Sequence, residues 1–247
     1  MCLMCSVAYG AGGVSLLLVN SGAPLALTAA SSTKTIASQT QTLQELPVTF
    51  EALKVPSLEE PGWLKAQNAA EEAAKNAAKK TPTTKVVTYD VSSRGPITAN
   101  MTEFRSQSNA TLNDGRGWSR LGVSFQEVAS GGMFTLVMST ADQMTSFSPG
   151  CGEEYSCRAG RYVIINQDRW LGATPSWNQA GGSLRDYRHM VVNHETGHWL
   201  GHGHASCGGS GQAAPVMQQQ SISLQGCSFN PWPTTSELWS SQLGITR

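Results

Sequence analysis

The histidines of this chain all fall within residues 189–204, and two of them are spaced as ligands of one metal ion. His194, Glu195 and His198 form the pattern His-Glu-x-x-His. Residues four positions apart lie on the same face of an α-helix, so both imidazole rings can reach a single ion. The sequence therefore predicts a metal site on one face of a helix.

The pattern continues through Gly201 to His204, which completes His-Glu-x-x-His-x-x-Gly-x-x-His. Glycine adopts positive φ and often ends helices, so the chain can turn there and bring His204 back to the ion. A catalytic zinc ion takes three protein ligands and keeps one position open for water. We therefore expect Zn²⁺ held by His194, His198 and His204, with Glu195 placed as a general base rather than a ligand.

Three neighbouring residues are alternatives to this assignment or need a separate role. His202 competes for the third position, but the motif spacing favours His204, and we expect His202 beside the site or facing solvent. Cys207 offers a thiolate, although a closed site containing cysteine would leave no room for water. His189 lies five residues before the first ligand, about 140° around the helix, and is expected at the surface.

A methionine follows the histidine pattern. Met217, in Pro215-Val216-Met217, lies thirteen residues after His204. This combination resembles the metzincin clan of zinc peptidases, in which a methionine sits in a tight turn under the metal. The resemblance implies that Met217 is no ligand and forms an apolar floor beneath the ion. Some metzincins carry a tyrosine two residues after the methionine, and Gln219 stands at that position here.

The resemblance also implies a fold. Metzincins have a zincin-like α+β fold: a twisted mixed sheet with a backing helix and an active-site helix, then a small loop-rich C-terminal subdomain with the Met-turn. Segments 193–204, 214–220 and 226–233 resemble more closely a family of secreted bacterial proteins described only as a domain of unknown function and taken to be zinc peptidases.

The function implied by the resemblance is zinc-dependent hydrolysis of peptide bonds outside the cytoplasm. A zinc-activated water would attack the carbonyl of a peptide or protein substrate, with Glu195 as the general base. One alternative keeps the zinc but takes a cell-wall amide as substrate. Another is a non-catalytic binding module that contains zinc, although a purely structural site needs no base such as Glu195.

Charge and composition narrow the class of partner. The formal net charge is zero and only 14% of the residues are charged. The sequence contains no basic patch of the kind that would indicate nucleic-acid binding. We expect a monomer. A length of 247 residues is typical of one domain with appendages.

The N-terminal third is expected to lie outside the catalytic domain. Residues 1–30 are nearly free of charge and apolar, which is typical of a signal peptide or a membrane anchor, although no basic residue precedes Lys34. Residues 31–84 are predicted to be a Ser/Thr/Gln-rich tether and, over 63–80, a solvated Ala/Lys/Glu helical spacer. The catalytic domain is expected at residues 85–247, secreted or anchored at the cell surface.

Hydrophobic patterns predict the elements of that domain. We expect four strands, at residues 85–91, 122–128, 133–139 and 161–166. We expect helices at 97–112 and 184–200, a short final helix at 236–243, and a loop over 172–182.

Four cysteines fall in the same region. In an exported chain they predict two disulfides, and the simplest pairing joins Cys151 to Cys157 and Cys207 to Cys227. The second pair would close a loop of about 20 residues around the Met-turn stretch and stabilise a segment with little core of its own.

Overall fold

The computed structural model describes residues 68–69, 72–74, 76 and 82–246. The predicted signal peptide or anchor, and most of the predicted tether, lie outside these residues. The elements in chain order are as follows: β1 (Lys85–Arg94), α2 (Met101–Leu112), η1 (Trp118–Leu121), β2 (Val123–Glu127), β3 (Phe134–Ser139), η2 (Ala141–Ser146), β4 (Cys157–Ala159), β5 (Tyr162–Asn166), α3 (Gln167–Gly172), α4 (Pro175–Gln179), α5 (Leu184–Leu200) and η3 (Thr235–Glu237).

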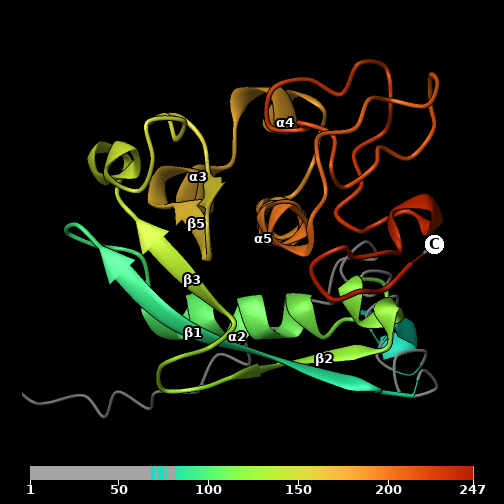
Figure 1. Cartoon of the computed structure of the whole chain (residues 1–247). Helices are drawn as coiled ribbons and strands as arrows, with labels where there is room; N and C mark the ends of the chain where they lie inside the picture. The colour runs from blue at the N-terminus through green and yellow to red at the C-terminus, as the bar shows by residue number, and fades with distance from the viewer. Residues whose placement is uncertain (1–67, 70–71, 75, 77–81, 247) are drawn as a thin grey trace, which may run out of the picture. The chain divides into compact units, whose positions relative to one another are not determined.

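A five-stranded sheet has the order β2-β1-β3-β5-β4. The first four strands are parallel to their neighbours, while β4 runs antiparallel to β5 and forms one edge (Figure 1). The sheet is therefore mixed, as the sequence predicts. Because α5 contacts both β4 and β5, the antiparallel edge lies beside the helix that carries the histidines.

Strands β3 and β5 are buried on both faces. Every residue of β3 is buried, which is typical of a parallel strand covered on two sides. Side chains alternate between the faces, so Leu136 and Met138 join the main core with the helices. Val137 and Ile164 face a second, smaller core that includes Met144.

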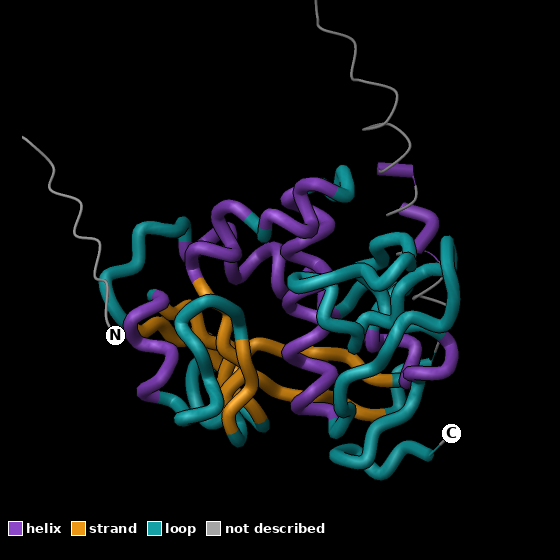
Figure 2. Tube along the Cα trace, turned by 90° about the horizontal axis from the view of Figure 1, so that it is seen from above, coloured by secondary structure: helices purple, strands orange, loops and turns teal. Residues whose placement is uncertain are grey.

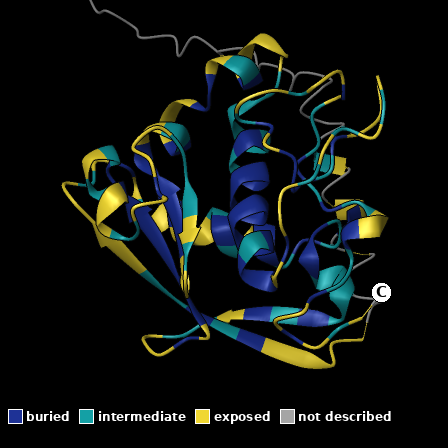
Figure 3. Ribbon diagram, turned by 45° about the horizontal axis from the view of Figure 1, so that its top comes forward, coloured by how far each residue is buried: buried dark blue, intermediate teal, exposed yellow. Residues whose placement is uncertain are grey.

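Helices α2 and α5 pack against each other and against the sheet. The Asn100 side chain caps α2 by accepting hydrogen bonds from the backbone N–H groups of Thr102 and Glu103. Most residues of α5 are buried, and Figure 3 shows this helix enclosed between the sheet and the C-terminal loops. The fold is thus an α+β arrangement in which the histidine helix forms part of the core.

The described chain after α5 consists mainly of loops (Figure 2). The final helix predicted at 236–243 is wrong, because only the single turn η3 forms there. Ser240 and Ile245 instead pair through two backbone hydrogen bonds of 2.8 Å, which fold the end of the chain into a tight turn. The Ser240 hydroxyl also donates to the Leu200 carbonyl at the end of α5.

Three short elements differ from the sequence prediction, and one of them, the six-residue helix α3, has no counterpart in it. The expected loop 172–182 contains α4, where the Thr174 hydroxyl caps the backbone N–H of Trp177 and the Trp177 side chain is fully buried. Strand β4 was not predicted at all. All three elements have six residues or fewer, so hydrophobic periodicity gives them little signal.

The described residues between 68 and 76 are helical, as predicted for the spacer. Ala74 is only 6% exposed, so this helix is not solvated on every side. None of the helices in the described ranges is long and apolar enough to cross a membrane.

Candidate metal centre

Helix α5 has strong start and stop signals that fix the histidine positions. The Ser183 side chain accepts a hydrogen bond from the backbone N–H of Asp186 at the start of the helix. At the other end Gly201 has φ +106°, and the next backbone N–H, of His202, donates to the Gly197 carbonyl at 3.0 Å. This is a Schellman ending, which requires a left-handed residue and turns the chain sharply.

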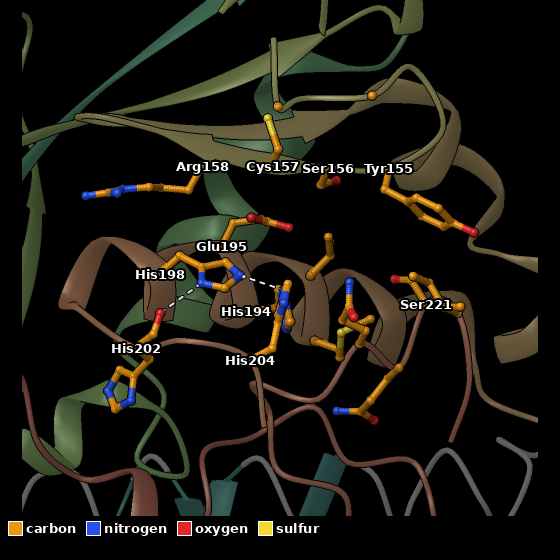
Figure 4. A pocket seen from close by; sticks show the side chains of 17 residues that line it. Tyr155, Ser156, Cys157, Arg158, His194, Glu195, His198, His202, His204 and Ser221 are labelled. Atoms are coloured by element: carbon orange, nitrogen blue, oxygen red, sulfur yellow. Dashed lines mark hydrogen bonds between the residues drawn. The ribbon is translucent and has the colours of Figure 1, made fainter. Parts of the chain in front are cut away.

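This turn brings three histidines together. The side-chain nitrogens of His194, His198 and His204 that could bind a metal all lie within 4.8 Å of one another. His198 Nε2 and His204 Nε2 are 3.2 Å apart, and Figure 4 shows the three rings converging. The predicted ligand set is therefore assembled in space and could hold a metal ion.

Backbone carbonyls orient two of these rings. His194 Nδ1 lies 2.8 Å from the Val216 carbonyl, and His198 Nδ1 lies 2.9 Å from the His202 carbonyl. A carbonyl can only accept, so each Nδ1 carries the proton and donates it. Each Nε2 consequently presents a lone pair toward the centre, as a metal ligand must.

Burial keeps the rings neutral. It lowers the pKa of His194 to about 3, and it is the main cause of the lowered pKa of His198 and of His204. At His198 the neighbouring histidines and the positive charge of Arg158 lower the pKa further. Neutral imidazole is the form that binds metal, so the site is ready for an ion at pH 7.

Glu195 is a buried carboxyl beside this centre. Its side chain lines the same cavity, and the residue is only 5% exposed. Burial raises its pKa to about 8. Its Oε2 has no hydrogen-bond partner within the described structure. A buried carboxyl with a perturbed pKa and a vacant oxygen in a cavity is a candidate for acid–base chemistry.

The cavity has a volume of about 400 Å³. Helix α5 forms its base, the 150–158 segment forms one wall and the 219–222 segment forms another (Figure 4). Its lining residues are Gly150, Gly152, Tyr155, Ser156, Cys157, Arg158, Met190, Val191, His194, Glu195, His198, His202, His204, Gln219, Gln220, Ser221 and Ile222.

Met217 is buried beside the helix that carries the histidines. It is 1% exposed and packs against α5 at Gly197. The turn that carries it is held by Glu237, whose carboxylate accepts the backbone N–H groups of Val216 at 3.1 Å and Met217 at 2.9 Å. Sequence reasoning missed Glu237, because nothing in its local sequence indicates a contact twenty residues upstream.

The four body cysteines form the two disulfides that the sequence predicts, Cys151–Cys157 and Cys207–Cys227. The alternative of Cys207 as a metal ligand is therefore wrong. The 151–157 disulfide ends at the first residue of β4 and closes the loop that forms one cavity wall. The cysteine pair was the only sequence signal for this wall.

The two remaining histidines have structural surroundings. His202 is buried and packs against Trp239, with ring centroids 4.1 Å apart and ring planes tilted by 48°. The surface position expected for His189 is wrong, since this residue is 5% exposed. Its Nδ1 lies 2.8 Å from the Thr111 hydroxyl, and its ring packs against Trp232 with the ring planes tilted by 37°.

Comparison with known proteins gives a family but no named relative. No curated protein and no solved structure matches the chain. One family model matches residues 64–234, a range that contains the histidine cluster, Glu195 and Met217. Because this match covers more than half of the chain, the protein belongs to the family described as "Protein of unknown function (DUF3152)".

Proposed function

We propose that this protein is a zinc-dependent endopeptidase of the metzincin type that acts outside the cytoplasm. The observation that carries the proposal is the position of Glu195 in the cavity that the three histidines line. Glu195 is a buried carboxyl, and its Oε2 has no hydrogen-bond partner in the described structure. Two disulfides support an extracytoplasmic location, because such bonds persist in oxidising compartments.

The donor set fits zinc. Imidazole nitrogens bind Zn²⁺ at about 2.0–2.1 Å, so two ligands of a tetrahedral site lie about 3.3 Å apart. His198 Nε2 and His204 Nε2 are separated by 3.2 Å. Three neutral histidines, with no fourth ligand among the residues that the structure describes, leave one position for water, as catalytic zinc sites do.

A zinc ion held there would supply a Lewis acid that lowers the pKa of water and polarises the scissile carbonyl. The positive ion would also lower the pKa of Glu195, so the carboxylate can serve as a base at neutral pH. Glu195 would take the proton of the attacking water and deliver it to the leaving amine. The Val216 carbonyl would keep the His194 ring in place through these steps.

The sheet edge beside the cavity suits an extended peptide. Strand β4 pairs with β5 on one side only, and no described strand occupies its other side. Ser156, Cys157 and Arg158 of this edge also line the cavity. Backbone groups at an open edge can bind a peptide as an added strand and hold its amide bond near the histidines.

Met217 supports the metzincin assignment. The sulfur and methyl of a buried methionine under the histidine helix would give the site an apolar floor. Its turn also carries Val216, whose carbonyl orients His194. In the proposed enzyme this turn is the Met-turn, and Gly201 is the glycine that ends the active-site helix and returns His204 to the metal.

The test combines metal analysis with turnover. The purified full chain is assayed for zinc per protein and for cleavage of a mixed peptide library, with and without a chelator. Glu195→Gln should retain the zinc and lower kcat by about 10³-fold or more, because only the base is lost. Glu103→Gln is the matched control, since Glu103 lies on α2 and pairs with Arg188 away from the cavity.

Each outcome separates the candidate functions. One zinc per chain and chelator-sensitive cleavage that Glu195→Gln abolishes would support the endopeptidase. Zinc with cleavage of muropeptides but not of protein-derived peptides would favour the cell-wall amidase. Zinc without turnover on either substrate would favour a binding module, and the absence of bound zinc would overturn the proposal.

A further inference from the structure

Arg158 differs from the other described lysine and arginine side chains in having no partner. Within the described ranges its guanidinium forms no hydrogen bond, ion pair or ring contact. The remaining described cations each contact an acidic group, a carbonyl, a hydroxyl, an aromatic ring or another group; they are Lys85, Arg94, Arg105, Arg116, Arg120, Arg161, Arg169, Arg185 and Arg188.

This cation lines the cavity. Arg158 is the only lysine or arginine among the lining residues of the described structure, and the only carboxyl there is Glu195. Figure 4 shows Arg158 at the His198 end of the cavity, with Tyr155 at the opposite end and the histidines between them. A substrate seated over the histidines would therefore have one positively charged side chain within the same cavity.

The backbone under Arg158 is held in place although the side chain is not. The Cys151–Cys157 disulfide ends at the preceding residue. Arg158 itself pairs with Val163 across the antiparallel ladder. The Ser156 hydroxyl accepts the backbone N–H of Asn166 at 3.0 Å. The strand therefore presents the guanidinium from a rigid position, which lowers the entropy cost of binding an anion.

The two acidic residues of the same loop do not neutralise it. Glu153 and Glu154 are exposed, and neither lines the cavity or pairs with Arg158. Arginine pairs with carboxylates through two parallel N–H···O bonds, a geometry that neutral side chains do not reproduce. The Arg158 guanidinium therefore remains available to pair with a carboxylate of a peptide substrate.

We propose that Arg158 is a specificity-determining residue that binds a carboxylate of the substrate close to the scissile amide. The inference rests on the proposed hydrolytic function and adds the substrate class, an acidic peptide. The carboxylate has two sources, an internal Asp or Glu side chain and a free C-terminus. Both would bind the guanidinium in the same way.

The experiment profiles cleavage by the zinc-loaded full chain. One peptide library is blocked at both ends and places Glu, Gln or Lys at each position around the cleaved bond. A second library compares free with amidated C-termini. The variants are Arg158→Gln, Arg158→Glu and, as the matched control, Arg161→Gln from the same hairpin, whose side chain bonds the Gly132 carbonyl instead.

For the native protein we expect kcat/KM to be about tenfold higher for Glu than for Gln at one position, or for a free than for an amidated C-terminus. Arg158→Gln should reduce this ratio to less than about twofold, and Arg158→Glu should favour Lys. Added salt should reduce the native ratio, because screening weakens a partly exposed pair. Arg161→Gln should keep it.

The failures are distinguishable. Cleavage by the native protein without any carboxylate preference, or a preference that survives in Arg158→Gln, would overturn the role of Arg158 and leave the peptidase standing. An absence of cleavage in every library by zinc-loaded native protein would overturn the proposed function together with the inference that rests on it.

Discussion

A Cβ atom placed on Gly197 would lie 2.2 Å from the Sδ atom of Met217. The same atom would lie 2.9 Å from Cζ2 of Trp118. The helix and the methionine turn can therefore approach this closely only because residue 197 has no side chain. Since the neighbouring turn residue Val216 bonds His194, this contact sets the position of a predicted ligand.

Gly197→Ala should destabilise the fold and weaken metal binding. Alanine improves helix propensity by about 1 kcal/mol, but overpacking of a buried contact costs about 1–3 kcal/mol. We expect a net loss in the free energy of unfolding and weaker zinc affinity, measured by urea unfolding and metal titration. Adding Met217→Ala removes the sulfur and should give a loss smaller than the sum of the two single changes. Strict additivity would show that the contact does not matter.

Glu237→Gln should loosen the turn under the site. Both carboxylate oxygens accept backbone N–H groups, one from Met217 and one from Val216. Glutamine has one acceptor oxygen, so a buried N–H loses its partner at a cost of about 1–3 kcal/mol. Because Val216 orients His194, zinc affinity should fall about tenfold or more. Unchanged zinc affinity with lowered stability would limit Glu237 to a structural role.

Removal of the Cys207–Cys227 disulfide by paired serine substitutions should cost more stability than removal of Cys151–Cys157. The bonded cysteines are 20 positions apart in Cys207–Cys227 and 6 positions apart in Cys151–Cys157. The chain-entropy model then gives about 3 and about 2 kcal/mol. The Cys151–Cys157 disulfide closes a cavity wall, so its removal should change kcat/KM more than removal of Cys207–Cys227 does. Denaturant unfolding and peptide cleavage of both variants check this ranking, and the reverse order would contradict it.

His189 should make stability depend on pH in mildly acidic solution. Burial is the main cause that lowers its pKa from 6.5 to about 4. Between these values the unfolded chain binds a proton there that the folded chain does not. Stability is therefore complete above about pH 6.5 and falls as the pH drops toward 4, by up to about 3 kcal/mol.

The measurement compares the native protein with His189→Gln. The variant loses the titrating group, so its free energy of unfolding should fall less steeply from pH 6.5 to 4. Parallel pH profiles for the two proteins would show that His189 is not responsible. The variant also loses the contacts of His189 with Thr111 and Trp232, and this loss lowers its stability by the same amount at every pH. The slopes of the two pH profiles are therefore compared, rather than the absolute stabilities.

The features that the sequence predicted well are local ones. The bounds of α5, residues 184–200, follow from a serine cap, a helical pattern and a glycine at the end, all within one segment. The histidine cluster follows from spacing along that helix and its turn. The disulfides follow from the small number of cysteines and their order in the chain.

The features that it missed depend on contacts between distant segments. His189 faces away from His194 as expected, but Thr111 of α2 and Trp232 of the C-terminal loops cover that face of α5. The predicted helix at 236–243 does not form, because Ser240 is hydrogen-bonded to Leu200 and Ile245 instead. Strand β4 is too short for a pattern and is fixed by its disulfide and by β5.

The contact between Glu237 and the methionine turn joins a residue outside the range of the family match to residues inside it. The family match ends at residue 234, yet the carboxylate that fastens the turn lies beyond it. So does Leu243, whose carbonyl accepts a hydrogen bond from Lys85 Nζ at the first strand. A chain shortened to the matched range would keep the candidate ligands and lose the carboxylate that holds the methionine turn. The contacts that fasten the methionine turn and the first strand thus extend past the range that the family model matches.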